Sequence, residues 1–176
     1  SSSAASDVYK RQLEANKIDK QFSMCEQVED GLDFLLRTNE YNSKTIGNNV
    51  VIIGGGYTSM DCARTALRLG AKSVRTFYRR TRGDLVILPG ELEELKREHG
   101  VMKFNARPNK IIMTTGKLSG LQLIKTRITN KGMLEDIRGS EFNIKTDHII
   151  LAIGQSQELN ILSGINNSRN LSLIHI

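Results

Sequence analysis

Hydrophobic positions fall into short apolar runs that alternate with segments of helical spacing. The run Asn48–Ile53 carries no polar alternation, which is typical of a strand buried on both faces of a parallel sheet. Ser73–Tyr78, Val101–Ala106 and His148–Ile153 are predicted as three further strands of this kind. Four such runs, with helical segments between the first three, indicate a layered α/β domain.

Three segments are predicted to be helical. Thr58–Leu69 repeats apolar residues at helical spacing, and Gly70 is expected to end it. Pro89 is expected to open a second helix at its first turn and Gly100 to close it. Leu13–Asn42 is also predicted as helix, because its apolar residues form a stripe: Val28, Leu32, Phe34, Leu35 and Leu36.

The pattern changes after Ala106. Three strand-like segments follow, separated by glycine and asparagine turns: Lys110–Thr114, Gly120–Thr129 and Phe142–Lys145. This pattern predicts an antiparallel meander. The predicted fold class is therefore α/β: a Rossmann-like doubly wound parallel sheet in which an antiparallel β-meander replaces one crossover helix.

Composition narrows the function classes. The 176 residues, 39% of them hydrophobic, suffice for one domain with a core, and no apolar run is long enough for a membrane span. The formal net charge is +6, yet aromatics make up only 5%, so a stacking groove for nucleic acid is not expected. Two cysteines without disulfide or zinc spacing fit a reducing cytoplasm.

The main chemical signal is a glycine turn between the first strand and the helix that follows it. Gly54 is predicted to permit the tight turn, and Gly56 to let the backbone approach a pyrophosphate. Ser59 is small enough for close packing of the helix on the strand. The amides at the start of the helix would then point at the phosphates.

The residues after the second strand predict which dinucleotide binds. Sites for NAD or FAD place a carboxylate about 20 residues downstream of the turn, on the ribose hydroxyls. Here Tyr78-Arg79-Arg80 begins 22 residues after Gly56, and no carboxylate follows before Asp84. Guanidinium groups suit a 2′-phosphate, so NADP(H) is the predicted cofactor.

A third element, Ala152-Ile153-Gly154, ends the last strand, where ligands of such sheets bind. It is predicted to let the backbone approach the nicotinamide. The candidate cofactor-binding residues are thus Gly54, Gly55, Gly56, Tyr57, Thr58, Ser59, Arg79, Arg80, Ala152, Ile153 and Gly154.

The other reactive side chains are expected to have structural roles. Cys62 is expected to be a small buried residue in its helix, and Asp61 a helix-start carboxylate whose direct role at the cofactor stays open. His99 and His148 have no partner at a spacing typical of a triad or a metal site. No catalytic residue and no metal ligand is predicted.

These motifs carry a resemblance. The sequence resembles the small subunit of NADPH-dependent glutamate synthase and related flavoproteins of the pyridine nucleotide-disulfide oxidoreductase superfamily. The matching segments are Val50–Val74, Phe77–Arg80, Leu88–Val101 and Ile150–Gln155. The resemblance covers about Thr45 to Gln155. It departs at Tyr57, where relatives have a small polar or acidic residue, and at Gln157, where a proline often stands.

The resemblance implies an NADPH-binding domain inserted between two halves of an FAD domain, with hydride passing from NADPH to FAD. It implies Gly54, Gly56 and Thr58 at the pyrophosphate, Arg79 and Arg80 at the 2′-phosphate, and Ala152–Gly154 at the nicotinamide. A large subunit or an iron–sulfur protein is the implied partner beside the FAD domain, and the final electron acceptor stays open. Binding without turnover is expected of this chain alone.

The expected domain organisation follows the same scheme. Residues 1–12 and 171–176 are interpreted as non-native translated scars, 13–46 as a helical connector from an FAD domain, 47–155 as the NADP(H)-binding domain, and 156–170 as a connector to the second FAD half. Two alternatives remain open: a non-catalytic dinucleotide-sensing or interaction module, and an FAD-binding Rossmann half.

Overall fold

A five-stranded parallel sheet organises the chain. The computed structural model describes residues 20–39 and 46–153. The strand order is β1 (Val28–Asp30), β9 (His148–Leu151), β2 (Asn49–Ile53), β3 (Ser73–Phe77) and β4 (Val101–Lys103), and every pair in it is parallel. β9, the last strand of the described residues, thus lies between β1 and β2, where it brings the end of the described chain beside the glycine turn.

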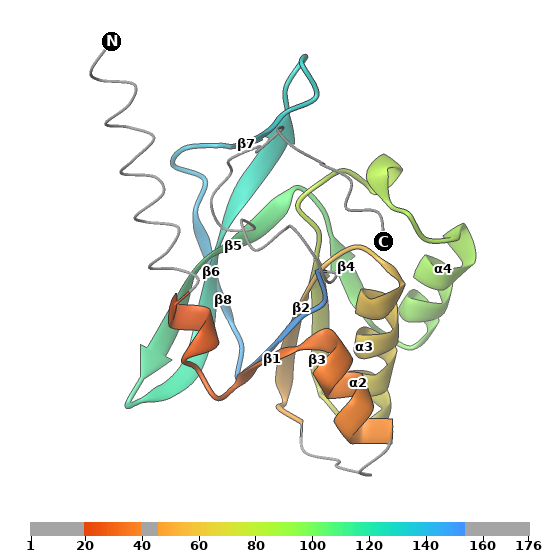
Figure 1. The fold of residues 1–176 in the computed structure, drawn as a ribbon, viewed down its shortest axis with the longest axis vertical. Helices are drawn as coiled ribbons and strands as arrows, with labels where there is room; N and C mark the ends of the chain where they lie inside the picture. Colours follow the sequence, from red (N-terminus) through yellow and green to blue (C-terminus); the bar gives the residue numbers. More distant parts are fainter. Residues whose placement is uncertain (1–19, 40–45, 154–176) are drawn as a thin grey trace, which may run out of the picture.

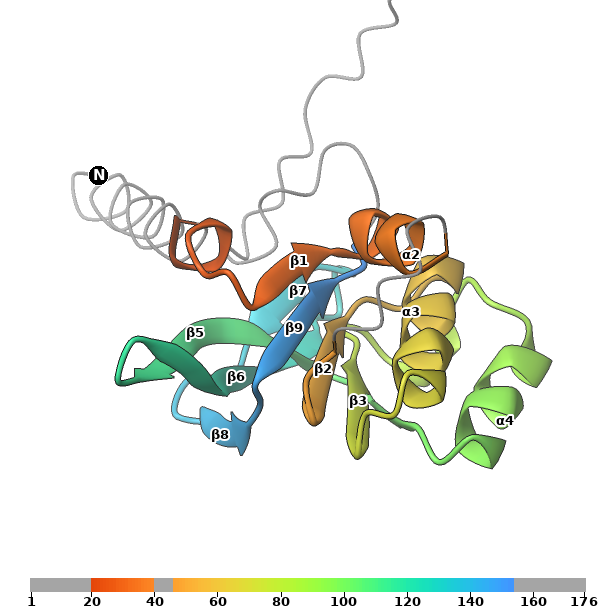
Figure 2. The ribbon, with the colours of Figure 1, turned by 90° about the horizontal axis from the view of Figure 1, so that it is seen from below.

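Three helices cover one face of this sheet (Figures 1 and 2): α2 (Gly31–Asn39), α3 (Tyr57–Arg68) and α4 (Pro89–Arg97). Phe34, Met60 and Leu95, one from each helix, lie in a single buried cluster with Val50 and Ile52 of β2. The helical stripes recognised in the sequence therefore serve one apolar layer against the sheet.

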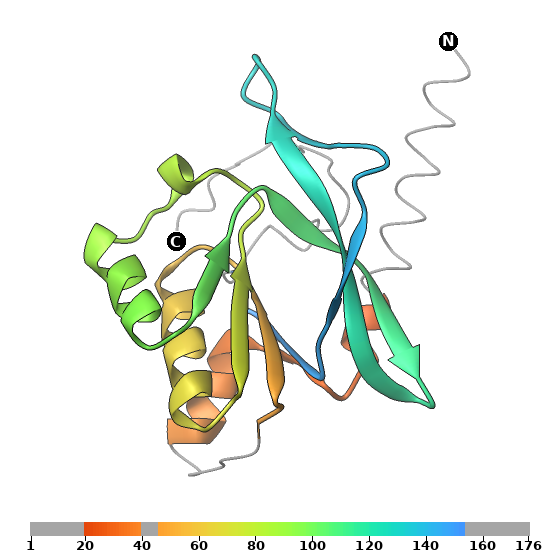
Figure 3. The same cartoon turned by 180° about the vertical axis from the view of Figure 1, so that it is seen from behind.

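An antiparallel sheet covers the opposite face (Figure 3). Its strands are β5 (Ala106–Thr114), β6 (Lys117–Ile128), β7 (Leu134–Asp136) and β8 (Phe142–Lys145), and β6 pairs with each of the other three. Val51 and Ile53 of β2 point into the cluster on this side, together with Leu121 and Leu123 of β6. Alternate residues of β2 thus enter two separate cores, which explains its unbroken run of apolar residues.

The predicted fold class is confirmed: a parallel sheet of Rossmann type with an antiparallel meander in place of a crossover helix. Gly70 ends α3 with φ of +98°, as expected of a glycine after a helix. At the end of α4 the positive φ of 67° falls on His99 instead of Gly100. The predicted strand Val101–Ala106 is two elements, since β4 ends at Lys103 and β5 begins at Ala106.

The single helix predicted over Leu13–Asn42 is wrong within the described residues. Val28–Asp30 is a strand that pairs with β9, and a separate helix begins at Gly31. Asp30 interrupts the helical stripe, because its Oδ1 accepts a hydrogen bond from the amide of Leu32 at 2.8 Å and so starts α2. The local sequence gives no sign of this strand, because its partner lies about 120 residues away.

Within residues 20–39 and 46–153, no helix is long and apolar enough to cross a membrane. A helical connector is expected over 13–46, but two described elements within it belong to this fold: β1 pairs within the five-stranded sheet, and α2 packs into the core with Phe34. The proposed division into domains otherwise stays a prediction.

Candidate functional site

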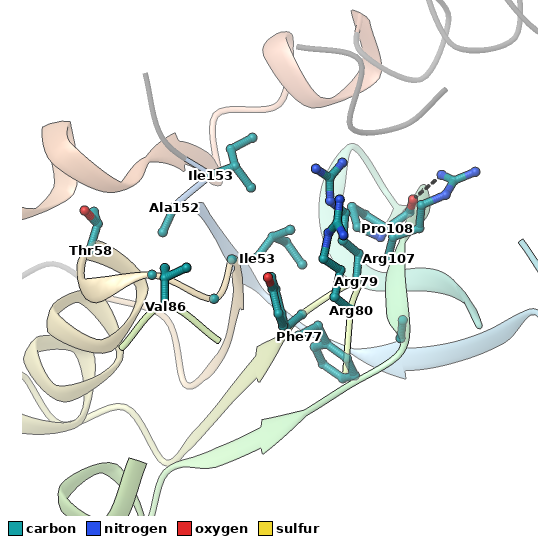
Figure 4. A pocket seen from close by; sticks show the side chains of 15 residues that line it. Ile53, Thr58, Phe77, Arg79, Arg80, Val86, Arg107, Pro108, Ala152 and Ile153 are labelled. Carbon is teal, nitrogen blue, oxygen red and sulfur yellow. Dashed lines mark hydrogen bonds between the residues drawn. The ribbon is translucent and has the colours of Figure 1, made fainter. Parts of the chain in front are cut away.

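A cavity of about 290 Å³ lies beyond the carboxyl ends of β2, β3 and β9 (Figure 4). Its wall contains residues from all three predicted elements: the glycine turn, the arginine segment and the end of the last strand. We call this cavity the crevice. The described lining residues are Ile53, Gly54, Gly55, Gly56, Thr58, Phe77, Tyr78, Arg79, Arg80, Val86, Ala106, Arg107, Pro108, Ala152 and Ile153.

Each glycine of the turn meets different surroundings. Gly54 has φ of +148°, and a Cβ there would lie 2.2 Å from the carbonyl oxygen of Ala152. A Cβ on Gly55 would lie 2.4 Å from the ring of Tyr78. A Cβ on Gly56 would meet nothing within 4 Å. The first two glycines thus let neighbouring parts of the protein come close, and the third leaves open space at the start of α3.

The start of α3 faces this space. Gly56 is its N-cap residue, with extended backbone and no side-chain hydrogen bond to the cap. The first backbone hydrogen bonds run from the amides of Ser59 and Met60 to the carbonyl of Gly56, at 3.1 and 3.3 Å. The amides of Tyr57 and Thr58 precede them and have no acceptor within the helix. Such amides, with the helix dipole behind them, attract an anion.

Two predicted residues of the turn do not line the crevice. Ser59 is fully buried, and its hydroxyl donates to the carbonyl of Gly56 at 2.7 Å. Its Cβ lies 3.3 Å from the position of a Cβ on Gly54, which agrees with the close helix–strand packing expected of it. Tyr57 points outward and is 47% exposed. Among the turn residues, Gly54, Gly55, Gly56 and Thr58 form the wall.

Arg79 and Arg80 both line the crevice, and Figure 4 shows them on the side away from Thr58. Their backbone is held from two sides. The hydroxyl of Thr126 on β6 donates to the carbonyl of Arg79 at 2.6 Å, and the amide of Asn105 donates to the carbonyl of Arg80 at 3.1 Å. The antiparallel sheet and the β4–β5 connection therefore fix the path of the arginine segment.

The first carboxylate after the arginines does not line the crevice. Asp84 ends a short 3₁₀ turn (Arg82–Asp84), and its Oδ2 accepts hydrogen bonds from the amide of Thr81 at 3.0 Å and from its hydroxyl at 2.5 Å. The hydroxyl bond, helped by the amide bond and the charge of Arg80, holds the pKa of Asp84 below its usual range. Asp84 thus caps a local turn, as a stable anion.

The end of β9 supplies the third element. Ala152 and Ile153 line the crevice, and the amide of Ala152 donates to the carbonyl of Ile53 at 2.8 Å. This bond holds the last strand against the beginning of the glycine turn. Gly154, the third residue predicted here, lies outside the described residues.

The crevice also contains residues that the motifs did not predict. The side chain of Arg107 is only 7% exposed, and it pairs with Asp136 of β7 through Nε–Oδ1 at 2.7 Å and through Nη2–Oδ2. Its Nη1 donates to the carbonyl of Pro108 at 2.9 Å, the dashed line in Figure 4. Val86 also lines the wall but is largely exposed. The Arg107–Asp136 pair spans 29 residues and has no local sequence signature.

Other candidate side chains lie away from the crevice. Cys62 is fully buried as expected, and burial raises the pKa of its thiol to about 12. Asp61 is exposed and is not part of the crevice wall. His148 contacts Glu29 at 2.5 Å, and Glu29 is also ion-paired with Arg37. Among the described residues, no group of three metal-ligating side chains could hold a metal ion.

The geometry meets two demands of NADP(H). A diphosphate needs unpaired amides and space close to the backbone, and the start of α3 beside Gly56 supplies both. A 2′-phosphate needs cations, and two guanidinium-bearing residues share the same cavity. The apolar Ile53, Ala152 and Ile153 add a hydrophobic stretch to the same wall.

Comparison with known proteins agrees with the sequence motifs. The chain is 40% identical over 117 residues to the small chain of NADPH glutamate synthase from Escherichia coli, a match that covers 61% of this chain and 24% of that one. It is 31% identical over 123 residues to the NADP(+)-dependent formate dehydrogenase subunit beta from Moorella thermoacetica, over 67% of this chain and 17% of that one. The predicted resemblance is therefore confirmed. The chain spans less than a quarter of either relative's length.

Solved structures confirm the fold. Thioredoxin reductase from T. acidophilum superposes with a TM-score of 0.52 at 18% identity, over 73% of this chain and 36% of that one. At this identity the likeness concerns the arrangement of the sheets and helices alone. No family model matches the chain.

Proposed function

We propose that the crevice binds NADPH and that this chain is the NADPH-binding domain of a flavin-dependent oxidoreductase. The main observation in support is that one cavity contains the glycine turn, the start of α3 and both Arg79 and Arg80. The sequence relatives support the cofactor, since the named function of each includes NADP(H). In this proposal FAD is bound by another part of the parent protein and accepts the hydride.

In the bound complex each part of the wall has a separate task. The amides of Tyr57 and Thr58 hold the diphosphate, because they have no acceptor within α3 and Gly56 leaves the approach open. Arg79 and Arg80 hold the 2′-phosphate through charge-assisted hydrogen bonds. Ala152 and Ile153 face the nicotinamide end, and Gly154 would extend this wall.

The bound cofactor supplies hydride, so the chain needs no nucleophile or metal of its own. Its residues bind and orient the dinucleotide and exclude water at Ile53 and Ile153. We propose that residues 47–155 form the NADP(H)-binding domain together with β1 and α2, and that 156–170 and the residues before β1 lead to a flavin domain. By itself the chain then binds NADPH without oxidising it.

The test is a calorimetric titration of the purified chain with NADPH and with NADH. We expect NADPH to bind more tightly, and the double variant Arg79→Ala/Arg80→Ala to lose about 100-fold or more of its NADPH affinity, since bonds to charged groups contribute about 1.5–3 kcal/mol each. NADH affinity should change little. Lys110→Ala/Lys117→Ala is the matched control, because both lysines are exposed and line no described cavity.

Equal losses for NADPH and NADH would contradict the assignment of the 2′-phosphate. The flavin part is tested separately, on the longer gene product that contains this segment. We expect it to purify with the absorbance of bound flavin and to bleach on addition of NADPH under anaerobic conditions. A longer product that binds NADPH without flavin would instead favour a nucleotide-sensing module.

A further inference from the structure

A second cavity, of about 550 Å³, lies where the edge of the parallel sheet meets the antiparallel sheet. We call it the trough. It is lined from β3 and β4 on one side and from β6 and β8 on the other, the four strands that Figure 3 shows from behind. It shares Phe77 and Ala106 with the crevice wall but contains neither the glycine turn nor Arg79 and Arg80. It is therefore a separate site.

The floor of the trough is apolar and aromatic. Phe77 and Phe142 lie with their ring centroids 6.5 Å apart and their planes tilted by 49°. Phe104, Ile137 and Ile144 complete the apolar surface. Aromatic surfaces of this kind, in a cavity of several hundred Å³, suit the flat apolar body of a small molecule.

The rim of the trough is cationic. It contains Arg75, Lys103 and Lys125, and the described wall contains no carboxylate. Within the described residues none of these three cations has an ion-pair partner. Most other described arginines pair with a carboxylate, as Arg37, Arg64 and Arg107 do, so the rim of the trough differs in its charge balance.

Arg75 is the anchored member of this rim. Its Nη2 donates to the carbonyl of Lys145 at 2.5 Å, which fixes the guanidinium beside β8. Its Nε is buried and has no acceptor among the described residues. A guanidinium always carries its charge, and a partly buried charge without a counterion is unfavourable. An anion in the trough would supply that counterion.

We propose that the trough binds a small organic acid that combines a flat apolar body with one carboxylate, sulfonate or phosphate group. The body would lie on the phenylalanine floor and the anionic group at the rim, between Arg75 and the two lysines. The geometry disfavours a second dinucleotide, because no described helix begins at this cavity to hold a diphosphate. An inorganic anion would leave the aromatic floor uncovered.

The probe for this site is 1-anilinonaphthalene-8-sulfonate, a fluorescent aromatic anion, added to the whole chain. We expect saturable binding that the uncharged N-phenyl-1-naphthylamine does not match and that saturating NADPH does not displace. The variant Lys103→Gln/Lys125→Gln should bind the sulfonate about three- to tenfold more weakly, since each solvent-exposed charge contributes modestly. Both lysines are exposed, so the change should leave the fold intact.

The control variant Lys110→Gln/Lys117→Gln removes the same charge from exposed positions outside the trough and should bind as the parent chain does. The proposal is overturned by absent or non-saturable binding, by equal affinity for the uncharged analogue, by equal losses in the two double variants, or by displacement with NADPH. Amide chemical shifts that change at Phe104 and Lys125 on titration would place the probe in the trough, and shifts confined to other residues would contradict it.

Discussion

The crevice and the trough share a wall but are built from different parts of the chain. The crevice owes its shape to backbone: a glycine turn, the first amides of α3 and strand ends, with two adjacent arginines added. The trough is built mainly from side chains of β3, β4, β6 and β8, with Phe104, Asn105 and Ile137 from the connections between strands. A backbone site needs particular residues in one short segment, whereas a side-chain site depends on two sheets coming together. We therefore expect the crevice to tolerate fewer substitutions than the trough.

The sharpest way to break the crevice is Gly54→Ala. The added Cβ would lie 2.2 Å from the carbonyl oxygen of Ala152, and φ of +148° is strained for alanine. We expect a loss of more than about 4 kcal/mol in the free energy of unfolding, because strain and a backbone clash add. Urea denaturation followed by circular dichroism measures it.

Gly56→Ala is the matched control for this change. Its Cβ meets nothing within 4 Å, so stability should fall by less than about 1 kcal/mol, the cost of alanine at an N-cap. NADPH affinity should nevertheless fall, since the methyl group occupies the approach to the first amides of α3. If both glycine variants lose the same stability, the distinct roles assigned to the two positions are wrong.

The next largest effect is expected from the shared wall. Phe77 is 4% exposed and lines both cavities, so Phe77→Ala should open one into the other. We expect a loss of about 3–4 kcal/mol in stability, as for other buried phenylalanines. Phe77→Leu should retain most of the stability. Because leucine is smaller than phenylalanine, Phe77→Leu should still open the wall in part. We therefore expect NADPH and the sulfonate probe to compete in the leucine variant and not in the parent chain, and no competition in the variant would contradict the role of Phe77 as the dividing wall.

The two regions also differ in how far the sequence predicts them. Most of the segment from Val50 to Arg80 could be predicted, because its strand, turn and helix follow one another in the chain and are required by local backbone geometry, and because the arginines stand where a carboxylate is otherwise expected. The binding roles of these residues remain predictions, but their convergence on one cavity was expected. Of the cofactor-binding residues predicted in this described segment, Tyr57 and Ser59 lie off the wall, since helical rotation turns one outward and buries the other.

What the sequence did not predict depends on distant pairs. The sequence predicts helix across β1, because three residues carry too weak a strand pattern and the strand depends on pairing with β9. Two side-chain contacts also form only when the sheets fold: Arg107 with Asp136, and Glu29 with His148. The trough belongs to this class, because none of its three cations is next to another in the sequence.

Thr126→Val tests how the antiparallel sheet supports the crevice. The Thr126 hydroxyl is buried and donates to the carbonyl of Arg79 at 2.6 Å, and valine has the same shape without the donor. We expect stability to fall by about 1–2 kcal/mol, the cost of an unpaired buried carbonyl. NADPH affinity should fall several-fold with little change for NADH, because only the arginine segment shifts. Thr126 also lines the trough, so unchanged sulfonate binding would show that the hydroxyl serves the crevice alone.

The smallest expected effect concerns a charge cluster outside both cavities. Burial alone would raise the pKa of Glu29, but hydrogen bonds from Arg37 and His148 and their charges outweigh it and lower that pKa from 4.5 to about 2. A carboxylate with a depressed pKa stabilises the folded state above its unfolded pKa and loses this contribution as the pH falls. The window therefore runs from about pH 4.5 down to about pH 2.

Because Glu29 and Arg37 both keep contact with solvent, we expect the contribution to be about 1 kcal/mol. Urea denaturation of the parent chain and of Glu29→Gln at pH 7 and pH 3 measures it, and the variant should lose less stability between the two. Other carboxylates titrate in both chains, so the difference reports the contribution of Glu29 together with its partners Arg37 and His148. Binding of NADPH and of the sulfonate probe at pH 7 should be the same in both chains, because Glu29 lines neither cavity. An altered affinity at either site would mean that the β1–β9 edge is coupled to the cavities. The charge cluster of Glu29, Arg37 and His148 would then contribute to binding beside the backbone of the crevice and the side chains of the trough.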